Sequence, residues 1–242
     1  HRAVGTRISY YLLKKYGHEK LEEDFLTLKF KGSAGQSFGA FGIKGLKLLL
    51  EGDANDYVAK GLSGASIVIK LHKHSNLISE QNTIIGNTVL YGATSGNLFA
   101  SGKAGERFAV RNSGATSVIE GCDSNGCEYM TGGNVVILGQ VGDNFAAGMT
   151  GGMAFIYDQK DEFEKKINPE TVVWQRVVTK YWQNLLKNLI EKHFEETNSK
   201  IAKKIISDYE NEIKYFYQVC PKEMLNKLDN PITTKDKINI AV

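Results

Sequence analysis

Residues 113–157 read SGATSVIEGCDSNGCEYMTGGNVVILGQVGDNFAAGMTGGMAFIY and repeat one phrase three times. Gly114, Gly133 and Gly152 are 19 residues apart, and a short run of β-branched and other apolar residues follows each of them. Glycine supplies turn conformations that other residues disfavour, whereas such apolar runs are typical of strands. A unit of about 19 residues with one short strand cannot bury its apolar side alone, so copies of the unit must stack.

The same spacing continues toward the N-terminus. The repeat glycines are Gly45, Gly64, Gly96, Gly114, Gly133 and Gly152, separated by 19, 32, 18, 19 and 19 residues. The long interval contains a polar stretch, residues 71–81, which we expect to loop out before Ile84 and Ile85 resume the pattern. The repeat predicts a mainly β fold, a right-handed parallel β-helix. An irregular β-sandwich is the alternative, but it gives no reason for a constant spacing.

Aromatic residues stand upstream of several repeat glycines. The predicted aromatic anchors of the repeat are Tyr57, Phe108, Tyr129 and Phe145. Glycine at the corners of each coil would let neighbouring backbones approach closely, so that each coil hydrogen-bonds to the next. We expect Ile137 and Phe155 to point inward, where replacement by alanine costs about 2–5 kcal/mol.

The segment before the repeats predicts a helix and a first strand. Residues 2–16 carry apolar side chains at helical spacing, and Gly17 is well placed to end a helix. Residues 25–30 then alternate imperfectly between apolar and polar side chains, as a first strand would.

The segment after the repeats predicts two helices. No glycine follows Tyr157, and apolar residues recur at helical spacing over 178–194 and 201–216. Asn198 or Ser199 is placed to cap the second of these helices. We expect the pair to cover an end or a side of the solenoid, whose terminal coil has unpaired edges.

These patterns divide the chain into two parts. We predict a glycine-repeat β-helix domain with its lead-in helix over residues 1–167. A helical appendage and a tail follow over residues 168–242, with Pro221 ending the last helix.

Composition limits the partners. The 30 basic and 27 acidic residues give a formal charge of +3, which predicts neither a nucleic acid nor a membrane partner. Three cysteines are too few and too irregularly spaced for a disulfide framework, which indicates the cytoplasm. The sequence has no apolar run of about 18 residues and no signal-peptide layout. It begins at His1 rather than methionine, so we expect the protein to extend upstream.

Glycine-rich sequence suggests a nucleotide or calcium site, but the spacing excludes both. No two glycines are separated by a single residue, so the dinucleotide motif G-x-G-x-x-G is absent. The segment from Gly96 to Lys103 has one residue too many for a phosphate loop. Neither glycine pair continues into the calcium-binding nonapeptide G-G-x-G-x-D.

Cysteines and histidines fail as metal ligands. Cys122 and Cys127 lack the third cysteine of a ferredoxin spacing, so we predict buried thiols. His72 and His74 lack further ligands nearby, so we predict that both are solvated.

Acidic residues of the glycine-rich part lie mostly in turn phrases, where they satisfy backbone donors. We therefore predict no catalytic, cofactor-binding or metal-binding residue. Glu106, Arg107 and Arg111 are expected either to pair with each other or to contact a neighbouring domain.

Four phrases carry a resemblance to a known family: LKFKGSAGQSFGAF, LEGDANDYVAKGLSG, IIGNTVLYGATSGNLFASGKAGERFAVRNSGA and NGCEYMTGGNVVILG. They resemble the C-terminal glycine-repeat (GXGXG) domain of the glutamate synthase large subunit, over roughly nine-tenths of the chain. The resemblance implies a noncatalytic domain of an oxidoreductase that forms L-glutamate from L-glutamine and 2-oxoglutarate in ammonia assimilation. In that family FMN and an iron–sulfur cluster belong to other domains, so none is expected in this segment.

The resemblance also implies partners. They are the glutaminase and FMN-binding synthase domains of the large subunit, which this segment would hold in register, and the small subunit. The segment alone is expected to be inactive. Two alternatives stay open: a separate scaffold subunit, similar to the β-helix subunit of formylmethanofuran dehydrogenase, and an independent carbohydrate-active β-helix.

Overall fold

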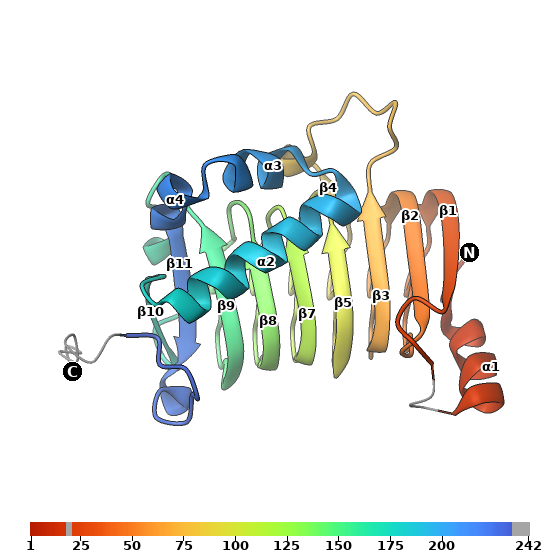
Figure 1. The fold of residues 1–242 in the computed structure, drawn as a ribbon, viewed down its shortest axis with the longest axis horizontal. Coiled ribbons are helices and arrows are strands. Elements are labelled where there is room, and N and C mark those ends of the chain that lie inside the picture. Colours follow the sequence, from red (N-terminus) through yellow and green to blue (C-terminus); the bar gives the residue numbers. More distant parts are fainter. Residues whose placement is uncertain (18–20, 234–242) are drawn as a thin grey trace.

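Stacked coils make up most of the computed structural model, which describes residues 1–17 and 21–233 (Figure 1). Seven successive coils each contribute one strand to a long sheet. These strands are β1 (Leu26–Ala34), β2 (Leu46–Ala54), β3 (Ser63–Lys70), β5 (Ser95–Ala100), β7 (Ser113–Ile119), β8 (Thr131–Ile137) and β9 (Gly151–Tyr157). All six neighbouring pairs are parallel. The predicted parallel β-solenoid is therefore confirmed.

The register of the sheet follows the sequence repeat. Val118 of β7 pairs with Phe99 on one side and with Val136 on the other. The strands that contain Gly114, Gly133 and Gly152 are thus consecutive neighbours, as the constant spacing predicts.

The irregular interval is a loop. Residues 71–78 leave the solenoid after β3, and the chain returns through a 3-10 turn, Ser79–Gln81 (Figure 1). Ile84 and Ile85 then form β4 (Thr83–Ile85), which lies on a second side of the coil with β6 (Lys103–Ala104). These two residues therefore resume the stack, and Ile85 also pairs with Ala54 at the end of β2.

Two buried clusters lie on opposite faces of the long sheet. One fills the solenoid interior and includes Ile67, Val135 and Ile137. The other contains the outward residues of five successive strands, Val68, Phe99, Val118, Val136 and Phe155. Strands buried on both faces need near-continuous apolar runs, which explains sequences such as VVIL.

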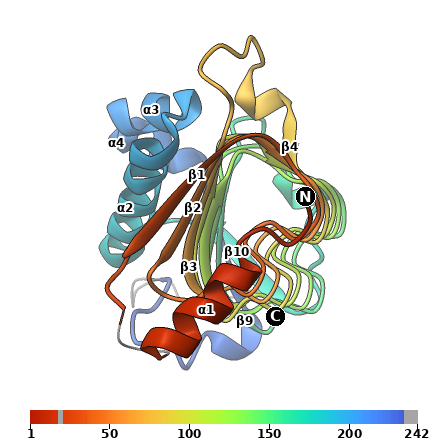
Figure 2. The ribbon, with the colours of Figure 1, turned by 90° about the vertical axis from the view of Figure 1, so that its right-hand side faces the viewer.

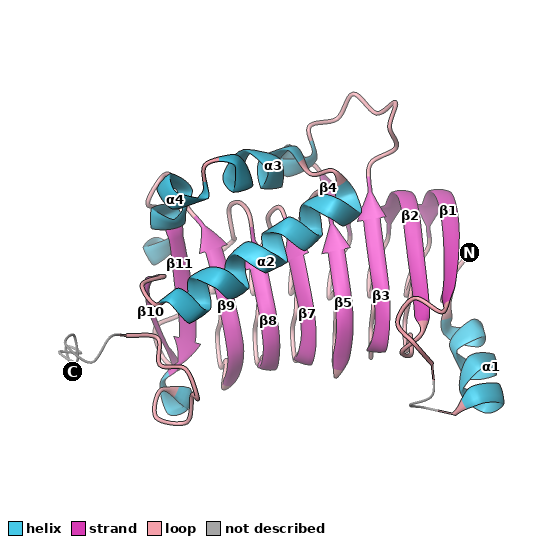
Figure 3. Cartoon of the chain, viewed as in Figure 1, coloured by secondary structure: helices cyan, strands magenta, loops and turns pink. Residues whose placement is uncertain are grey.

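Helices cover the outward face of the sheet. They are α2 (Lys180–Thr197), which crosses several strands obliquely, and α3 (Lys200–Ser207) (Figure 3). Trp182 of α2 packs on Phe155 with ring centroids 6.2 Å apart. The expectation for Ile137 is confirmed, because its side chain lies in the interior. The expectation for Phe155 was wrong, because its side chain is buried under the helices and not inside the solenoid.

The two ends of the solenoid differ. At the N-terminal end, α1 (Thr6–Tyr16) buries Leu12 against the first coils and ends at Gly17, as predicted. At the other end, β11 (Phe216–Pro221) pairs antiparallel with β9, and β10 (Val172–Arg176) pairs with β11. The sheet therefore continues across the predicted boundary at residue 167.

The second predicted helix is shorter than expected. Ser199 caps α3 by accepting a hydrogen bond from the backbone N–H of Ala202, but α3 ends at Ser207. A short helix, α4 (Tyr209–Glu212), and a 3-10 turn, Ile213–Tyr215, follow. Phe216 then begins β11, because its segment supplies the hydrogen bonds that the edge of β9 would otherwise lack. Pro221 thus ends a strand and not a helix.

Phe155→Ala tests the packing between sheet and helices. Phe155 is fully buried, so we expect the free energy of unfolding to fall by about 3–5 kcal/mol. Urea denaturation measures this loss. Lys29→Ala, at an exposed position of β1, is the control and should change stability by less than about 0.5 kcal/mol. Equal losses in the two variants would contradict the packing described.

Candidate functional site

Glycine serves the solenoid in two ways. Five repeat glycines have positive φ values from +81° to +116°, and these are Gly45, Gly64, Gly96, Gly133 and Gly152. Gly114 is absent from this set; instead, a Cβ atom there would lie 2.1 Å from the carbonyl oxygen of Thr94 in the preceding coil. Left-handed backbone and close approach of coils therefore both select glycine.

Non-glycine residues also adopt left-handed backbone at the corners, which the sequence did not reveal. In one coil Tyr57, Ala59 and Gly61 have φ values of 60°, 56° and 60°. Their N–H groups alternate in direction: Tyr57 donates to Asn87 of the next coil, whereas Ala59 donates to Phe38 of the preceding coil. Each corner is thus bonded to both neighbouring coils, which holds residues in a conformation that costs about 1–2 kcal/mol each.

The four predicted aromatic anchors are of two kinds. Phe108 and Phe145 are fully buried in the interior. Tyr57 and Tyr129 are 37% and 51% exposed, because they occupy the alternate corner positions with positive φ. The Tyr129 ring lies over Gly148, where a Cβ atom would be 2.4 Å from it. The buried pair anchors the core, and Tyr129 covers a glycine of the next coil.

The three residues expected at an interface lie on the same series of corners. Arg107 pairs with Glu128, with 3.4 Å between Nε and Oε2, and not with Glu106. The backbone N–H of Glu106 donates to Asn87 Oδ1 at 2.9 Å. Glu106 and Arg111 are exposed and form no ion pair with any described residue. Their contact with a neighbouring domain stays a prediction.

All three cysteines are buried free thiols, so the expectation for Cys122 and Cys127 is confirmed. Burial raises the pKa of Cys122 to about 12, and the charge of Asp123 contributes. Burial also raises the pKa of Cys127 well above its usual value and that of Cys220 to about 11. Thiols that keep their protons are poor nucleophiles and poor metal ligands.

We expect these thiols to make the fold sensitive to alkali. In the unfolded chain Cys122 would ionise near the ordinary thiol pKa of 9.0, whereas burial raises its pKa in the folded chain to about 12. The unfolded state therefore binds fewer protons over this window, and stability falls as pH rises. The slope is at most about 1.4 kcal/mol per pH unit for each thiol. Urea midpoints between about pH 8 and 11 should fall less steeply for Cys122→Ala; an unchanged slope would contradict this.

The histidine pair has no further ligands. The rings of His72 and His74 are 5.3 Å apart in the loop after β3, and His74 is exposed. Within residues 1–17 and 21–233, no group of three or more His, Cys, Asp or Glu side chains is placed to hold a metal ion. In the same part of the chain, no helix is long and apolar enough to cross a membrane.

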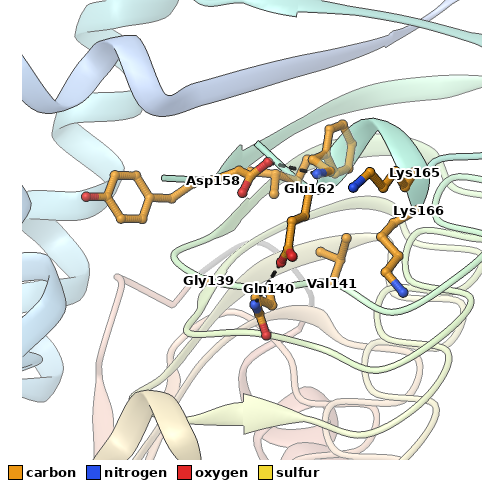
Figure 4. A pocket seen from close by; sticks show the side chains of 10 residues that line it. Gly139, Gln140, Val141, Asp158, Glu162, Lys165 and Lys166 are labelled. Atoms are coloured by element: carbon orange, nitrogen blue, oxygen red, sulfur yellow. Dashed lines mark hydrogen bonds between the residues drawn. The ribbon is translucent and has the colours of Figure 1, made fainter. Parts of the chain in front are cut away.

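A pocket of about 460 Å³ lies at the C-terminal end of the solenoid (Figure 4). Its charged lining residues are Asp158, Glu162, Lys165 and Lys166. Asp158 accepts a hydrogen bond from the Phe163 N–H at 2.8 Å, and Glu162 accepts one from Gln140 at 3.3 Å. Both carboxylates thus stabilise the local chain.

The pocket lacks the parts of a catalytic site. Its lining contains no serine, cysteine or histidine. The Tyr157 hydroxyl is hydrogen-bonded to Glu212; burial, followed by this bond, raises its pKa. Lys166 pairs with Asp143 at 2.7 Å. The lining therefore offers no nucleophile with an adjacent base.

One buried polar cluster was missed by sequence reasoning. Glu120 follows β7, His193 lies on α2 and Ser199 caps α3, and each is at most 2% exposed. The Ser199 hydroxyl donates to Glu120 Oε1 at 2.5 Å, and His193 Nε2 lies 3.6 Å from the same oxygen. Glu120 and Ser199 are 79 residues apart in the sequence, so no local pattern relates them.

This cluster joins the helices to the solenoid and has no catalytic arrangement. Its hydroxyl points to the carboxylate and not to the imidazole, so no base is placed to activate it. The Ser199 oxygen also accepts the Ala202 N–H, which fixes it as a helix cap. Solvent and substrate have no access to side chains that are fully covered.

The chain matches known proteins in sequence over most of its length. The model of the family described as GXGXG motif matches residues 1–222. The chain is 58% identical over 231 residues to the glutamate synthase [NADPH] large chain of Azospirillum brasilense, covering 96% of this chain and 15% of that one. It is 50% identical over 220 residues to ferredoxin-dependent glutamate synthase 2 of Synechocystis, covering 91% and 14%.

A third relative gives the same proportions. The glutamate synthase [NADPH] large chain of Bacillus subtilis is 48% identical over 222 residues, covering 91% of this chain and 15% of that one. The chain thus spans only about 15% of the length of such relatives. These matches confirm the resemblance seen in the glycine phrases, and the chain belongs to the GXGXG motif family.

Proposed function

We propose that the chain is the C-terminal, noncatalytic structural domain of a glutamate synthase large chain. There it holds the glutaminase and FMN-binding domains in register while L-glutamate is formed from L-glutamine and 2-oxoglutarate. One observation carries the proposal: in relatives named as glutamate synthase large chains, a segment about 15% of their length matches this solenoid. The pocket carboxylates Asp158 and Glu162 and the buried Ser199 hydroxyl are used for hydrogen bonds within the chain, which supports a structural role.

The solenoid suits a scaffold because it resists deformation. Parallel ladders link each coil to the next, and the alternating corner bonds link each coil to both neighbours. The helices and the buried Glu120 cluster stiffen one face. In this proposal the protein is cytoplasmic, and other domains of the large chain bind FMN and the iron–sulfur cluster. The exposed corner residues Glu106 and Arg111 contact one of those domains.

Expression of the chain on its own tests the proposal that this domain binds no flavin and catalyses no reaction. We expect the purified chain to be colourless and to show neither glutaminase nor glutamate-forming activity. The large chain that contains the segment should lose most glutamine-dependent glutamate formation when the segment is removed. Flavin absorbance and glutamate formation measure both effects.

Pocket variants supply the matched control in the complete large chain. Asp158→Asn and Glu162→Gln should leave the turnover of folded protein within about twofold, because the carboxylates bond only to the local chain. Stoichiometric flavin on the separate chain would refute the proposal. A loss of more than about tenfold in a folded pocket variant would do so as well.

A further inference from the structure

The N-terminal end of the solenoid has an unpaired strand edge. Among residues 1–17 and 21–233, β1 pairs with β2 and with no other strand. The N–H of Leu26 donates to Gly45 of the next coil, so by strand alternation the N–H groups of Thr27, Lys29 and Lys31 point to the open side. Figure 2 looks at this end and shows β1 in front, with α1 below it and not along its edge.

Apolar side chains are incompletely covered at this edge. Leu26, Leu28 and Phe30 face the interior but are only half-buried. Their neighbours in β2 are Leu46, Leu48 and Leu50, which are at most 2% exposed. Phe25, just before β1, is 54% exposed. The first coil therefore presents a row of free backbone groups beside a half-covered apolar surface.

The opposite end shows how this fold covers such an edge. There β11 pairs with β9, and Phe163 and Val172 are 1% exposed where they close the interior. An uncovered edge invites pairing with another chain, and terminal coils of solenoids are normally capped. The N-terminal edge has the features of a surface that another segment covers.

The charge of β1 indicates which kind of segment would pair with its free edge. The outward side chains of β1 are Thr27, Lys29 and Lys31, and the strand carries no acidic residue. A second copy of the chain would set one lysine-bearing strand against another, which is unfavourable. On the paired side of β1, Lys31 lies 3.9 Å from Glu51 of β2, so an acidic neighbour is already accommodated beside this lysine. An incoming strand with acidic residues on its outward face and apolar residues on its inward face is complementary.

We propose that the free edge of β1 binds an extended acidic segment of the remainder of the large chain, which adds a strand to the solenoid. This rests on the proposed function, because that remainder is the part of the relatives that this chain does not span. Backbone hydrogen bonds to the amides of Thr27, Lys29 and Lys31 provide affinity, and the two lysines select an acidic partner.

Carbodiimide cross-linking of the complete large chain tests the proposal. The reagent joins amines to carboxylates in direct contact, and mass spectrometry locates the products. We expect Lys29 or Lys31 to be joined to a carboxylate outside this segment but within the same chain, in addition to the Lys31–Glu51 product. Only Lys31–Glu51, or products between isotopically distinct copies, would overturn the proposal.

Amide exchange in the same protein gives a second measurement. The backbone amides of Thr27 and Lys31, which point to the open edge, should exchange at least tenfold more slowly than unprotected amides. Lys29→Pro should remove that protection. Lys29→Arg, which keeps both the amide and the positive charge, should change it by less than threefold. Rapid exchange of both amides in the unmodified large chain would overturn the docking. If deletion of the segment still abolished glutamate formation, the scaffold proposal would stand without it.

Discussion

Gly133→Ala is expected to lower the free energy of unfolding by about 2–5 kcal/mol. Gly133 has a φ of +87°, and a Cβ atom there would lie 2.2 Å from the carbonyl oxygen of Ala115 in the preceding coil. The left-handed backbone costs about 1–2 kcal/mol for alanine, and overpacking against a backbone atom adds about 1–3 kcal/mol. The clash is with backbone that the ladder holds in place, so relaxation of one coil disturbs the next.

Gly92→Ala is the matched control. Gly92 also has a positive φ, +63°, but a Cβ atom there would meet no atom within 4 Å. Gly92→Ala should therefore lower the free energy of unfolding only by the cost of the left-handed backbone, about 1–2 kcal/mol. Urea denaturation of both variants separates the two contributions. Equal losses would mean that the coils do not approach each other as closely as the structure shows.

Glu120→Ala is expected to cost about 3 kcal/mol and to loosen the helices on the sheet. The substitution removes the acceptor of the Ser199 hydroxyl and the oxygen that lies 3.6 Å from His193 Nε2, and both of these side chains stay buried. Leaving buried polar groups without partners costs about 1–3 kcal/mol for each group. Amide exchange should therefore increase in α2 and α3 more than in the interior strands β7 and β8.

Two controls accompany this prediction. Glu120→Gln keeps an oxygen that accepts from Ser199, so its loss should be about half as large or less. Glu106→Ala removes an exposed carboxylate and should change stability by less than about 0.5 kcal/mol. A Glu120→Ala variant as stable as Glu106→Ala would show that the buried cluster does not hold the helices.

The sequence predicted the features that repeat locally. The constant spacing of Gly114, Gly133 and Gly152 predicted the stack, and the helical periodicity of residues 178–194 predicted α2. Such signals need only one segment at a time. The polar stretch over residues 71–81 likewise predicted the loop that interrupts the solenoid.

The sequence did not predict features that depend on distant partners. Phe155 was assigned to the interior because alternation alone does not tell which of two buried faces a side chain joins. Residues 216–221 were assigned to a helix because nothing local marks the pairing of β11 with β9. Glu120 and His193 meet only after α2 folds back across the sheet.

The left-handed backbone at the corners was only partly predictable from the sequence, for a different reason. The sequence signal for such backbone is glycine, yet Tyr57, Arg107 and Tyr129 have φ values of 60°, 60° and 52°. Hydrogen bonds to both neighbouring coils stabilise these corners, so left-handed backbone occurs there without glycine and is not visible in the residue type. Exposed aromatic and basic side chains are consequently displayed along the outside of the solenoid.

Disulfide formation between stacked positions tests the coil register most directly. Asn97 of β5 pairs with Thr116 of β7, which pairs in turn with Asn134 of β8. Neighbouring strands lie about 4.8 Å apart, within the range that a disulfide bridges, whereas two coils span about twice that distance. Asn97→Cys with Thr116→Cys should oxidise to a bridge detected by mass spectrometry, and Asn97→Cys with Asn134→Cys should stay reduced. A bridge in the second folded variant and none in the first would contradict the stacked solenoid.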